Sequence, residues 1–388
     1  MSTRELMETN RFEDLWLGGR MSRRQAKKVL ASYGIGMAAM PMLGGGARAA
    51  EEQAMMFTWA GYEEPAFNQH YFDTYGAWPN FSFFADEEEA FNKMRAGFAP
   101  DVMLPCSYKV PLWHEAELLA PVDTSLLTNW PDLLPPLKDI PGTVIGGEHY
   151  FVPQKWGITG LMVRTDLAPE LADPANQSWG IMWDEAYAGR LGHFDSINDN
   201  VVIAAVYAGV ADPFNMTDAE IAEVKDLLAR QIPLLRMMAS SVTDLSQALA
   251  SGELVASVAW NSMSAHAVEA AAETGSGAEL QWVNPREGVL TWVCGLTIHA
   301  SAKERGMYEK AHVLIDSFIS PEAGVFETTN WLYGHSNARV YDLIDDGTLQ
   351  AAGLSRDVDG YLNNGIFLEP MPNEDKVAAM WEEVKAGF

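Results

Sequence analysis

The feature that most limits the fold of this chain is its alternation of capped amphipathic helices with short apolar runs. Thr217 and Glu220 make a capping box ahead of a helix with one apolar face, and a second amphipathic helix follows Asn373. The apolar runs between such helices are bounded by Gly or Pro and include 101–105, 160–163, 254–260 and 292–299. Helices that alternate with short apolar strands predict an α/β fold with mainly parallel sheets.

Charge excludes several classes of partner. The 388 residues include 53 Asp and Glu against 26 Lys and Arg, a formal net charge of -27. Nucleic acids and anionic lipids are bound largely through Lys and Arg, so neither is an expected partner. The hydrophobic fraction of 48% is enough for sizeable cores.

The first fifty residues differ from the remainder, because they carry eight basic and four acidic residues. Arg23 and Arg24 precede a mildly apolar run from Val29 to Leu43, and Ala47-Arg48-Ala49 supplies a small-x-small cleavage pattern. This order predicts a twin-arginine secretory signal at 1–49, followed by an exported, soluble mature chain. The apolar run is shorter than the ~20 residues that a spanning helix needs.

Motifs for catalysis and for cofactors are scarce. The eight histidines have no metal-ligand spacing, and there is no phosphate-binding or dinucleotide motif, so we expect no metal and no cofactor. Gly334–Ala338 nearly matches a nucleophile elbow around Ser336, but its last residue is Ala. We therefore assign no catalytic residue. The acidic run 86–89 is typical of a solvated helix start.

Aromatic side chains follow the apolar runs at unusual frequency. They stand beside Gly, Pro, Asn or Ser, at Trp59, Tyr62, Tyr108, Trp156, Trp260, Trp292 and Tyr333. Ligands of α/β sheets bind at strand ends, where aromatic rings can enclose a cation. Each ring alone is as well explained by packing at the edge of a core, so the set carries the prediction.

Several blocks in order resemble the periplasmic substrate-binding proteins of polyamine-type ABC importers. The blocks are Phe57–Tyr62, Phe91–Gly97 with Asp101–Pro105, Tyr150–Gly160, Ser178-Trp179 with Trp183–Arg190, Val258–Asn261, Pro285–Gly288 and Trp381–Lys385. The second block is similar to a helix ending in K-x-x-A-G, and the third to Y-x-V-P-x-x-W-G-x-T-G.

The resemblance implies a two-lobed periplasmic binding protein fold, with hinge strands and a ligand cleft between the lobes. Residues 50–160 and 293–365 would form the first lobe, and 161–292 the second. Residues 366–388 would pack on the second lobe. The implied ligand-binding residues are Trp59, Tyr62, Glu63, Cys106, Tyr108, Trp156, Asp195, Asn198, Trp260, Trp292, Cys294 and Tyr333.

Two departures from the polyamine pattern bear on the ligand. The family places acids at the positions that match Cys294 and Asn198, and both are neutral here. An unpaired buried ammonium is costly, so a ligand with one cationic centre is favoured over a polyamine. Glu63, Glu64 or Glu369 could substitute for the missing acids.

The two cysteines, Cys106 and Cys294, would both lie near the cleft. A disulfide is conceivable in an oxidising compartment. We expect two unpaired thiols, since a bond there could restrict closure.

Together these features predict a periplasmic, non-enzymatic receptor that acts as a monomer. It would capture a small polyamine, quaternary ammonium or zwitterionic ligand and deliver it to the permease subunits of an ABC importer. The alternatives are a periplasmic hydrolase, or a sensory binding protein on the same fold.

Overall fold

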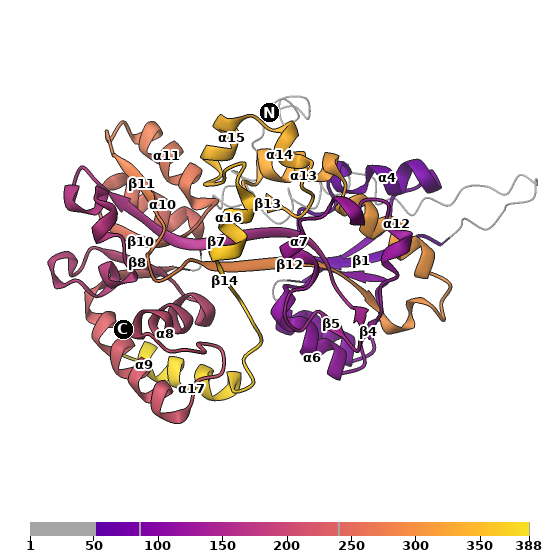
Figure 1. Ribbon diagram of the computed structural model, residues 1–388, viewed down its shortest axis with the longest axis horizontal. Coiled ribbons are helices and arrows are strands. Elements are labelled where there is room, and N and C mark those ends of the chain that lie inside the picture. Colours follow the sequence, from indigo (N-terminus) through magenta and orange to yellow (C-terminus); the bar gives the residue numbers. More distant parts are fainter. Residues whose placement is uncertain (1–51, 85–86, 240, 388) are drawn as a thin grey trace, which may run out of the picture. The chain divides into compact units, whose positions relative to one another are not determined.

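The computed structural model describes residues 52–84, 87–239 and 241–387 (Figure 1). The twin-arginine signal predicted at 1–49 lies outside these residues. Within the described ranges, no helix combines the length and the apolar character needed to cross a bilayer.

Twelve strands of the described residues form one mixed sheet. Its main path runs through β2 (Asn80–Phe83), β1 (Met55–Thr58), β3 (Val102–Met103), β12 (Leu290–His299), β7 (Val152–Arg164), β10 (Ala256–Trp260), β8 (Leu191–Phe194) and β9 (Leu235–Ala239). Short strands β4 (Leu119–Ala120), β11 (Leu280–Val283), β13 (Gly334–His335) and β14 (Ile366–Phe367) pair with β7 or β12, while β5 (Val144–Ile145) and β6 (Glu148–His149) pair separately.

The expectation of mainly parallel sheets is wrong, although the α/β class is confirmed. The outer pairs β1–β2, β1–β3, β8–β10 and β8–β9 are parallel. The two long central strands, β7 and β12, run antiparallel to each other, and β12 is also antiparallel to β3 and β7 to β10. β7 and β12 are antiparallel because the chain crosses the molecule in one direction along β7 and returns in the other direction along β12.

The predicted helices begin where their caps indicate. Thr217 and Glu220 make both hydrogen bonds of the capping box at the start of α9 (Asp218–Gln231). Asn373 precedes α17 (Glu374–Lys385). The other helices are α4 (Pro65–Tyr75), α5 (Glu87–Arg95), α6 (Val110–Glu115), α7 (Pro135–Lys138), α8 (Ile203–Ala208), α10 (Val242–Ser251), α11 (Met263–Thr274), α12 (Tyr308–Phe318), α13 (Pro321–Asn330), α14 (Val340–Leu343), α15 (Asp346–Ala351) and α16 (Val358–Asn364).

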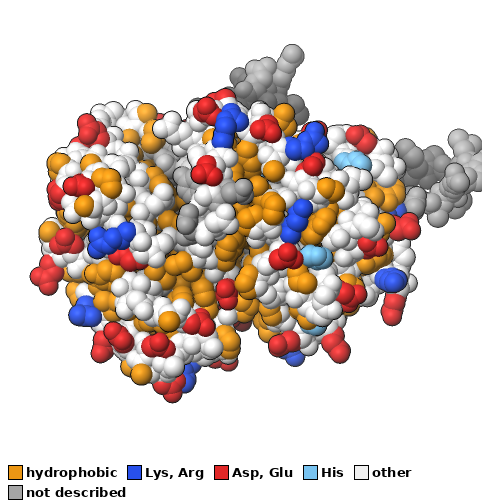
Figure 2. Space-filling view, in the orientation of Figure 1, with side chains coloured by type: hydrophobic (Ala, Val, Ile, Leu, Met, Phe, Trp, Pro, Cys, Tyr) orange, Lys and Arg blue, Asp and Glu red, His pale blue; other side chains and the backbone are white. Residues whose placement is uncertain are grey.

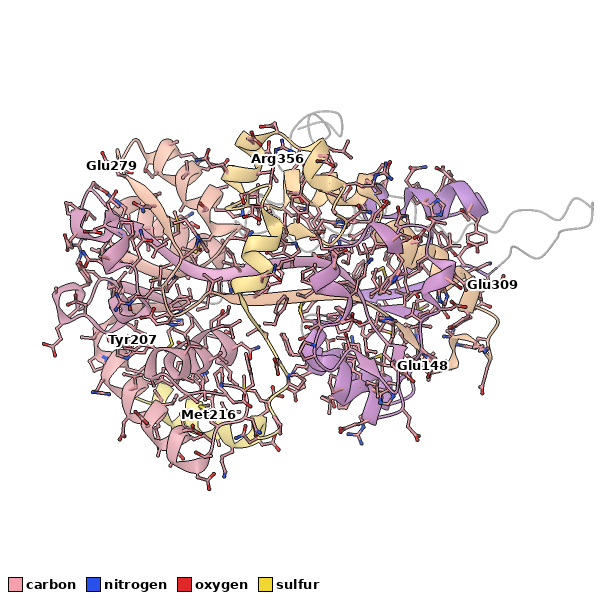
Figure 3. All side chains as sticks on the ribbon, viewed as in Figure 1. Glu148, Tyr207, Met216, Glu279, Glu309 and Arg356 are labelled. Atoms are coloured by element: carbon pink, nitrogen blue, oxygen red, sulfur yellow. A yellow bond between two sulfur atoms is a disulfide. The ribbon has the colours of Figure 1, made fainter. Side chains whose placement is uncertain are left out.

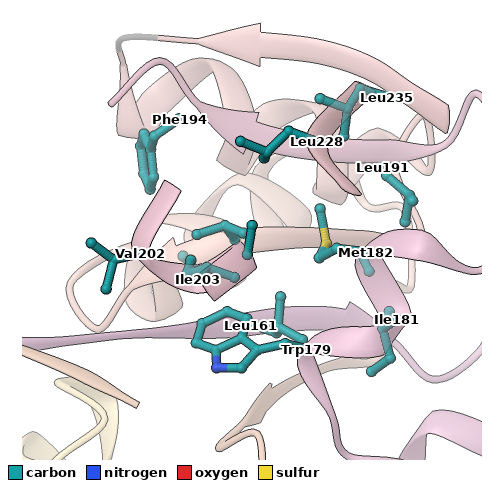
Figure 4. Close-up of a cluster of buried hydrophobic side chains, with 14 of the residues drawn as sticks. Leu161, Trp179, Ile181, Met182, Leu191, Phe194, Val202, Ile203, Leu228 and Leu235 are labelled. Carbon is teal, nitrogen blue, oxygen red and sulfur yellow. The ribbon is translucent and has the colours of Figure 1, made fainter. Parts of the chain in front are cut away.

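Separate hydrophobic cores lie on the two sides of the crossing strands. One contains Trp179, Phe194 and Leu228, fully or almost fully buried, together with Trp381 of α17 (Figure 4). Two other clusters are built from residues before 159 and after 288. The sheet is therefore continuous, whereas the cores are separate. Below, the second half of the molecule is the part around the core that contains Trp179, and the first half is the part around the other two clusters.

The C-terminal helix is fixed to the core that contains Trp179. α17 packs on α9, beside Met216 (Figure 3). The Asn373 side chain donates a hydrogen bond to the Met216 carbonyl at 2.9 Å. Leu368 and Met371 of the preceding segment are buried in the same cluster. The segment that leads to α17 thus runs from β14 to the second half of the molecule.

Candidate functional site: a cavity over the crossing strands

A cavity of about 270 Å³ is lined by residues from both halves of the molecule. Its lining consists of Trp59, Glu87, Cys106, Tyr108, Lys155, Ser196, Asn198, Asp199, Trp260, Trp292, Cys294, Tyr333 and Leu368. Figure 2 shows hydrophobic side chains gathered near the centre of one face of the molecule, with acidic side chains spread around them.

The floor of the cavity is one face of the β7–β12 ladder. Side chains two residues apart on a strand point the same way, so Lys155, Gly157 and Thr159 of β7 share a face. Lys155 is paired with Cys294, and Gly157 with Trp292. At the far end, Thr159 is paired with Trp260 of β10. The strand register therefore places Cys294, Trp292 and Trp260 on one face of the sheet, in that order along β7. This line of side chains from Lys155 to Thr159 is called the row below.

Gly157 is needed where it stands because the Trp292 indole lies directly over it. A Cβ built on Gly157 would lie 2.1 Å from a ring carbon of Trp292 and 2.7 Å from the Asn261 Oδ1 atom. Any side chain at position 157 would displace the ring. Trp292 also meets Tyr333 edge to face, with ring centroids 5.1 Å apart.

We expect Gly157→Ala to weaken ligand binding by about tenfold, because the added methyl group would push the Trp292 ring out of the cavity floor. Calorimetric titration of the variant beside Trp292→Ala measures this effect. The two variants should lose similar affinity while circular dichroism stays that of the wild type. Unchanged affinity in Gly157→Ala would show that the position of the indole does not matter for binding.

Asp199 is a buried carboxylate at the Thr159 end of the row, in the second half of the molecule. It accepts hydrogen bonds from the Thr159 hydroxyl at 3.0 Å and from the Trp260 indole at 3.3 Å. Burial raises the pKa of Asp199, and the hydrogen bonds from Ser196, Thr159 and Trp260 oppose that rise. All three donors are neutral, so the residues that hold this carboxylate do not balance its charge.

Glu87 is a second carboxylate in the lining. It stands at the start of α5 and accepts the Cys106 N–H at 2.5 Å, as well as a hydrogen bond from the Tyr108 hydroxyl. Burial raises the pKa of Glu87, while the Cys106 N–H and the charge of Lys109 act to lower it. The sequence-based assignment of the run 86–89 to a solvated helix start is therefore wrong for Glu87, whose side chain faces inward.

Lys155 contributes a cation to the same cavity. Its Nζ atom donates to the Tyr62 hydroxyl and lies 4.7 Å from the centre of the Tyr62 ring and 5.3 Å from that of Tyr333. Burial lowers the pKa of Lys155, and the negative charge of Glu327 opposes this. Glu327 lies behind Tyr62, outside the cavity lining.

Eight of the residues predicted from the sequence line this cavity: Trp59, Cys106, Tyr108, Asn198, Trp260, Trp292, Cys294 and Tyr333. Four others do not. Tyr62 is 3% exposed and lies one layer deeper, and Trp156 is buried with its indole bonded to the Tyr341 hydroxyl. Glu63 caps the Gly61 N–H at the surface, and Asp195 pairs with Lys385 at 3.1 Å.

The lining also contains residues that the sequence analysis did not select, namely Glu87, Lys155, Ser196, Asp199 and Leu368. Lys155 stands out in the sequence as the one charged residue of the crossing segment 150–160, but the sequence does not tell which way its side chain points. Glu63, Glu64 and Glu369, suggested as substitutes for the two missing acids, are not in the lining. Asn198 is neutral, but its neighbour Asp199 is not, and Glu87 supplies a second carboxylate.

Cys106 and Cys294 form a disulfide, so the expectation of two unpaired thiols is wrong. Cys106 follows β3, and Cys294 lies in β12, the antiparallel neighbour of β3. The two residues face each other as an isolated bridge, which brings their side chains together. The disulfide is part of the cavity wall.

The family model for bacterial extracellular solute-binding proteins matches residues 80–334, more than half of the chain. The chain belongs to this family. Its members are transport receptors, not enzymes, and the function of this solute-binding protein is accordingly that of a receptor.

Similar proteins extend the assignment. The solute-binding protein is 26% identical over 314 residues to the putrescine/agmatine-binding protein of Pseudomonas aeruginosa, covering 76% of this chain and 82% of that one. It is 25% identical over 270 residues to the spermidine/putrescine-binding periplasmic protein of Escherichia coli, covering 69% and 72%.

Solved structures agree on the fold. A spermidine/putrescine ABC transporter substrate-binding protein of Streptococcus pneumoniae superposes with a TM-score of 0.70 at 17% identity, covering 87% of this chain and 99% of that one. The structure of a putative spermidine/putrescine ABC transporter of Listeria monocytogenes gives 0.68 at 20% identity, covering 86% and 99%. The two-lobed periplasmic binding protein fold predicted for this chain is confirmed.

A hydrolase that uses Ser336 as its nucleophile is contradicted by the surroundings of this residue in the solute-binding protein. Ser336 is fully buried, and its hydroxyl donates to the Pro153 carbonyl at 2.7 Å. A nucleophile has to reach its substrate, whereas this serine fixes the end of β13 to β7. Among the described residues, no group of three or more His, Cys, Asp or Glu is placed to bind a metal.

Proposed function

We propose that this protein is a periplasmic receptor that captures a small amine between its lobes and delivers it to an ABC importer. The twin-arginine signal predicted at 1–49 would export it, and it would act as a monomer. Relatives named for putrescine, agmatine and spermidine binding support an amine ligand and an importer as partner.

The observation that carries the proposal is the uncompensated carboxylate of Asp199. A buried carboxylate held only by neutral donors is stabilised most by a cation that arrives with the ligand. Trp260 lies beside it, and Trp292 provides the floor, so an ammonium could be bound by Asp199 while methylene groups pack on indole rings. Glu87 would serve a cation on the other wall of the same cavity.

Closure on the ligand follows from where these groups come from. Asp199 and Trp260 belong to the second half of the molecule, and Glu87, Tyr108 and Trp59 to the first. A ligand that touches both sets stabilises the arrangement in which the two halves approach each other. The complex so formed would be the species presented to the importer.

A thermal-shift screen followed by calorimetric titration tests the proposal. The panel would contain mono-, di- and triamines, quaternary ammonium compounds and ω-amino acids, each beside a neutral isostere in which a hydroxyl replaces the amine. We expect stabilisation only by compounds with a cationic nitrogen, about 2.7 kcal/mol at a hundredfold excess over the dissociation constant. Stabilisation by a neutral isostere, with none by any amine, would contradict the proposal.

A further inference from the structure

Lys155 gives the cavity a feature that an amine receptor does not need. In the part of the chain that the structure describes, it is the one Lys or Arg in the cavity lining, and its ammonium lies against the Tyr62 and Tyr333 rings. An ammonium has three N–H donors, and among the described residues Lys155 uses one of them, toward the Tyr62 hydroxyl. Two N–H groups of Lys155 are therefore left to donate to an acceptor inside the cavity.

The charges of Lys155 and Asp199 are at opposite ends of one row. Lys155 and Thr159 are four residues apart on β7, so their Cα atoms are separated by about 13 Å at roughly 3.3 Å per residue. Asp199 is hydrogen-bonded to Thr159, at the far end from Lys155. The Trp292 ring over Gly157 lies between the two ends. A ligand stretched along this row meets a carboxylate first, then an indole, then an ammonium.

The other charges near Lys155 do not remove its positive field from the cavity. Glu327 lies on the far side of Tyr62, where Gln154 donates to its Oε2 atom at 2.6 Å and the Tyr62 hydroxyl lies 3.4 Å from its Oε1 atom. Burial raises the pKa of Glu327, while the charge of Lys155 and the hydrogen bonds from Gln154 and Tyr62 oppose that rise. Glu87 is in the lining, and its negative charge also acts on Lys155, but its carboxylate accepts from the Cys106 N–H and the Tyr108 hydroxyl and forms no ion pair with the Lys155 Nζ atom.

We infer that the ligand is a zwitterion of the ω-amino acid class and that Lys155 binds its carboxylate. This rests on the proposed amine-binding function and names the substrate class of the same site. The ammonium of the ligand would be bound at Asp199, its methylene groups would cover Trp292, and its carboxylate would accept the two remaining N–H groups of Lys155. A diamine would instead bring its second ammonium toward that of Lys155 in a cavity walled largely by aromatic side chains, where like charges repel more strongly than in water.

Titration with three compounds of equal chain length tests the inference: an ω-amino acid, the diamine with an ammonium in place of the carboxylate, and the monoamine with a methyl group there. We expect the wild type to bind the amino acid at least tenfold more tightly than the other two. In Lys155→Met the affinity for the amino acid should fall at least tenfold, whereas affinity for the diamine should rise.

Lys376→Met is the matched control, because it removes the same charge from a surface ion pair with Asp218. Its affinities should equal those of the wild type. Lys155→Gln, which keeps a hydrogen-bond donor, covers the case in which Lys155→Met melts early, and it should show the same reversal of preference.

The outcomes separate the inference from the proposed function. If the wild type prefers the diamine, or if both Lys155 variants keep full affinity for the amino acid, Lys155 is not an anion subsite, although the protein remains an amine receptor. If none of the three compounds binds, the inference is wrong, and the amine-binding function falls with it only if no amine of the wider panel stabilises the protein.

Discussion

Asp199→Asn is expected to weaken binding of the amine ligand by about 100-fold or more. Truncating one partner of a buried, hydrogen-bonded charge pair costs roughly 2–5 kcal/mol, because the other charge is left in the site without a counterion. The amide keeps the shape of the carboxylate, and its single oxygen, at the position of Oδ1, can still accept from the Thr159 hydroxyl and, at 3.4 Å, from the Trp260 indole. Titration calorimetry with the tightest amine of the panel measures the loss.

Stability should move in the other direction, or not at all. Because burial raises the pKa of Asp199, its charged form is disfavoured by the fold, and the neutral amide escapes that cost. We therefore expect the melting temperature of ligand-free Asp199→Asn to equal or exceed that of the wild type at pH 7. A large loss of both affinity and stability would point to a structural role instead.

Asp195→Asn is the matched control, four residues earlier in the same segment. Asp195 is exposed and pairs with Lys385 at 3.1 Å, outside the cavity. Surface ion pairs contribute little, so affinity should change by less than about threefold. If Asp195→Asn loses affinity while Asp199→Asn keeps it, the carboxylate chosen from the sequence is the functional one and the cavity geometry misleads.

The difference between Asp195 and Asp199 shows what the sequence could and could not predict. Caps and apolar runs located α9, α17, β7, β10 and β12, because those signals act within a few residues. The residues after β8 enter a π-helical turn, Asn198–Val202, before α8 begins. An extra residue in a turn changes which side chain faces inward, and no periodic pattern reveals it. The resemblance placed an acid at the position of Asn198, and the carboxylate in the cavity belongs to the next residue, Asp199.

Glu87 and Lys155 were missed for a different reason. Charged residues at a helix start or within a strand are usually solvated, and only tertiary structure shows that these two face a common cavity. Trp156 and Tyr62 show the opposite error. Their aromatic rings were predicted to line the cleft, but both are buried one layer below it. The sequence could predict which types of residue line the cleft. Which side chains point into it depends on the register between β7 and β12, which the sequence does not show.

The largest effect on stability is expected from loss of the Cys106–Cys294 disulfide. The bond closes a segment with a sequence separation of 188 residues, for which the chain-entropy model gives about 5 kcal/mol of stabilisation. Measured values for native disulfides are typically about 2–5 kcal/mol, so the double variant Cys106→Ser, Cys294→Ser should melt roughly 3–7 °C lower. Differential scanning calorimetry of the variant and of the wild type, with and without reductant, measures this shift.

Ligand affinity should fall in the same variant, because the disulfide is part of the cavity wall and the Cys106 N–H holds Glu87. Reductant should destabilise the wild type but have no effect on the double variant, which serves as its control. Mass spectrometry after alkylation decides whether the bond exists in solution. If both cysteines of the untreated, folded protein are alkylated, the thiols are free, and the cavity wall is held by strand pairing between β3 and β12 alone.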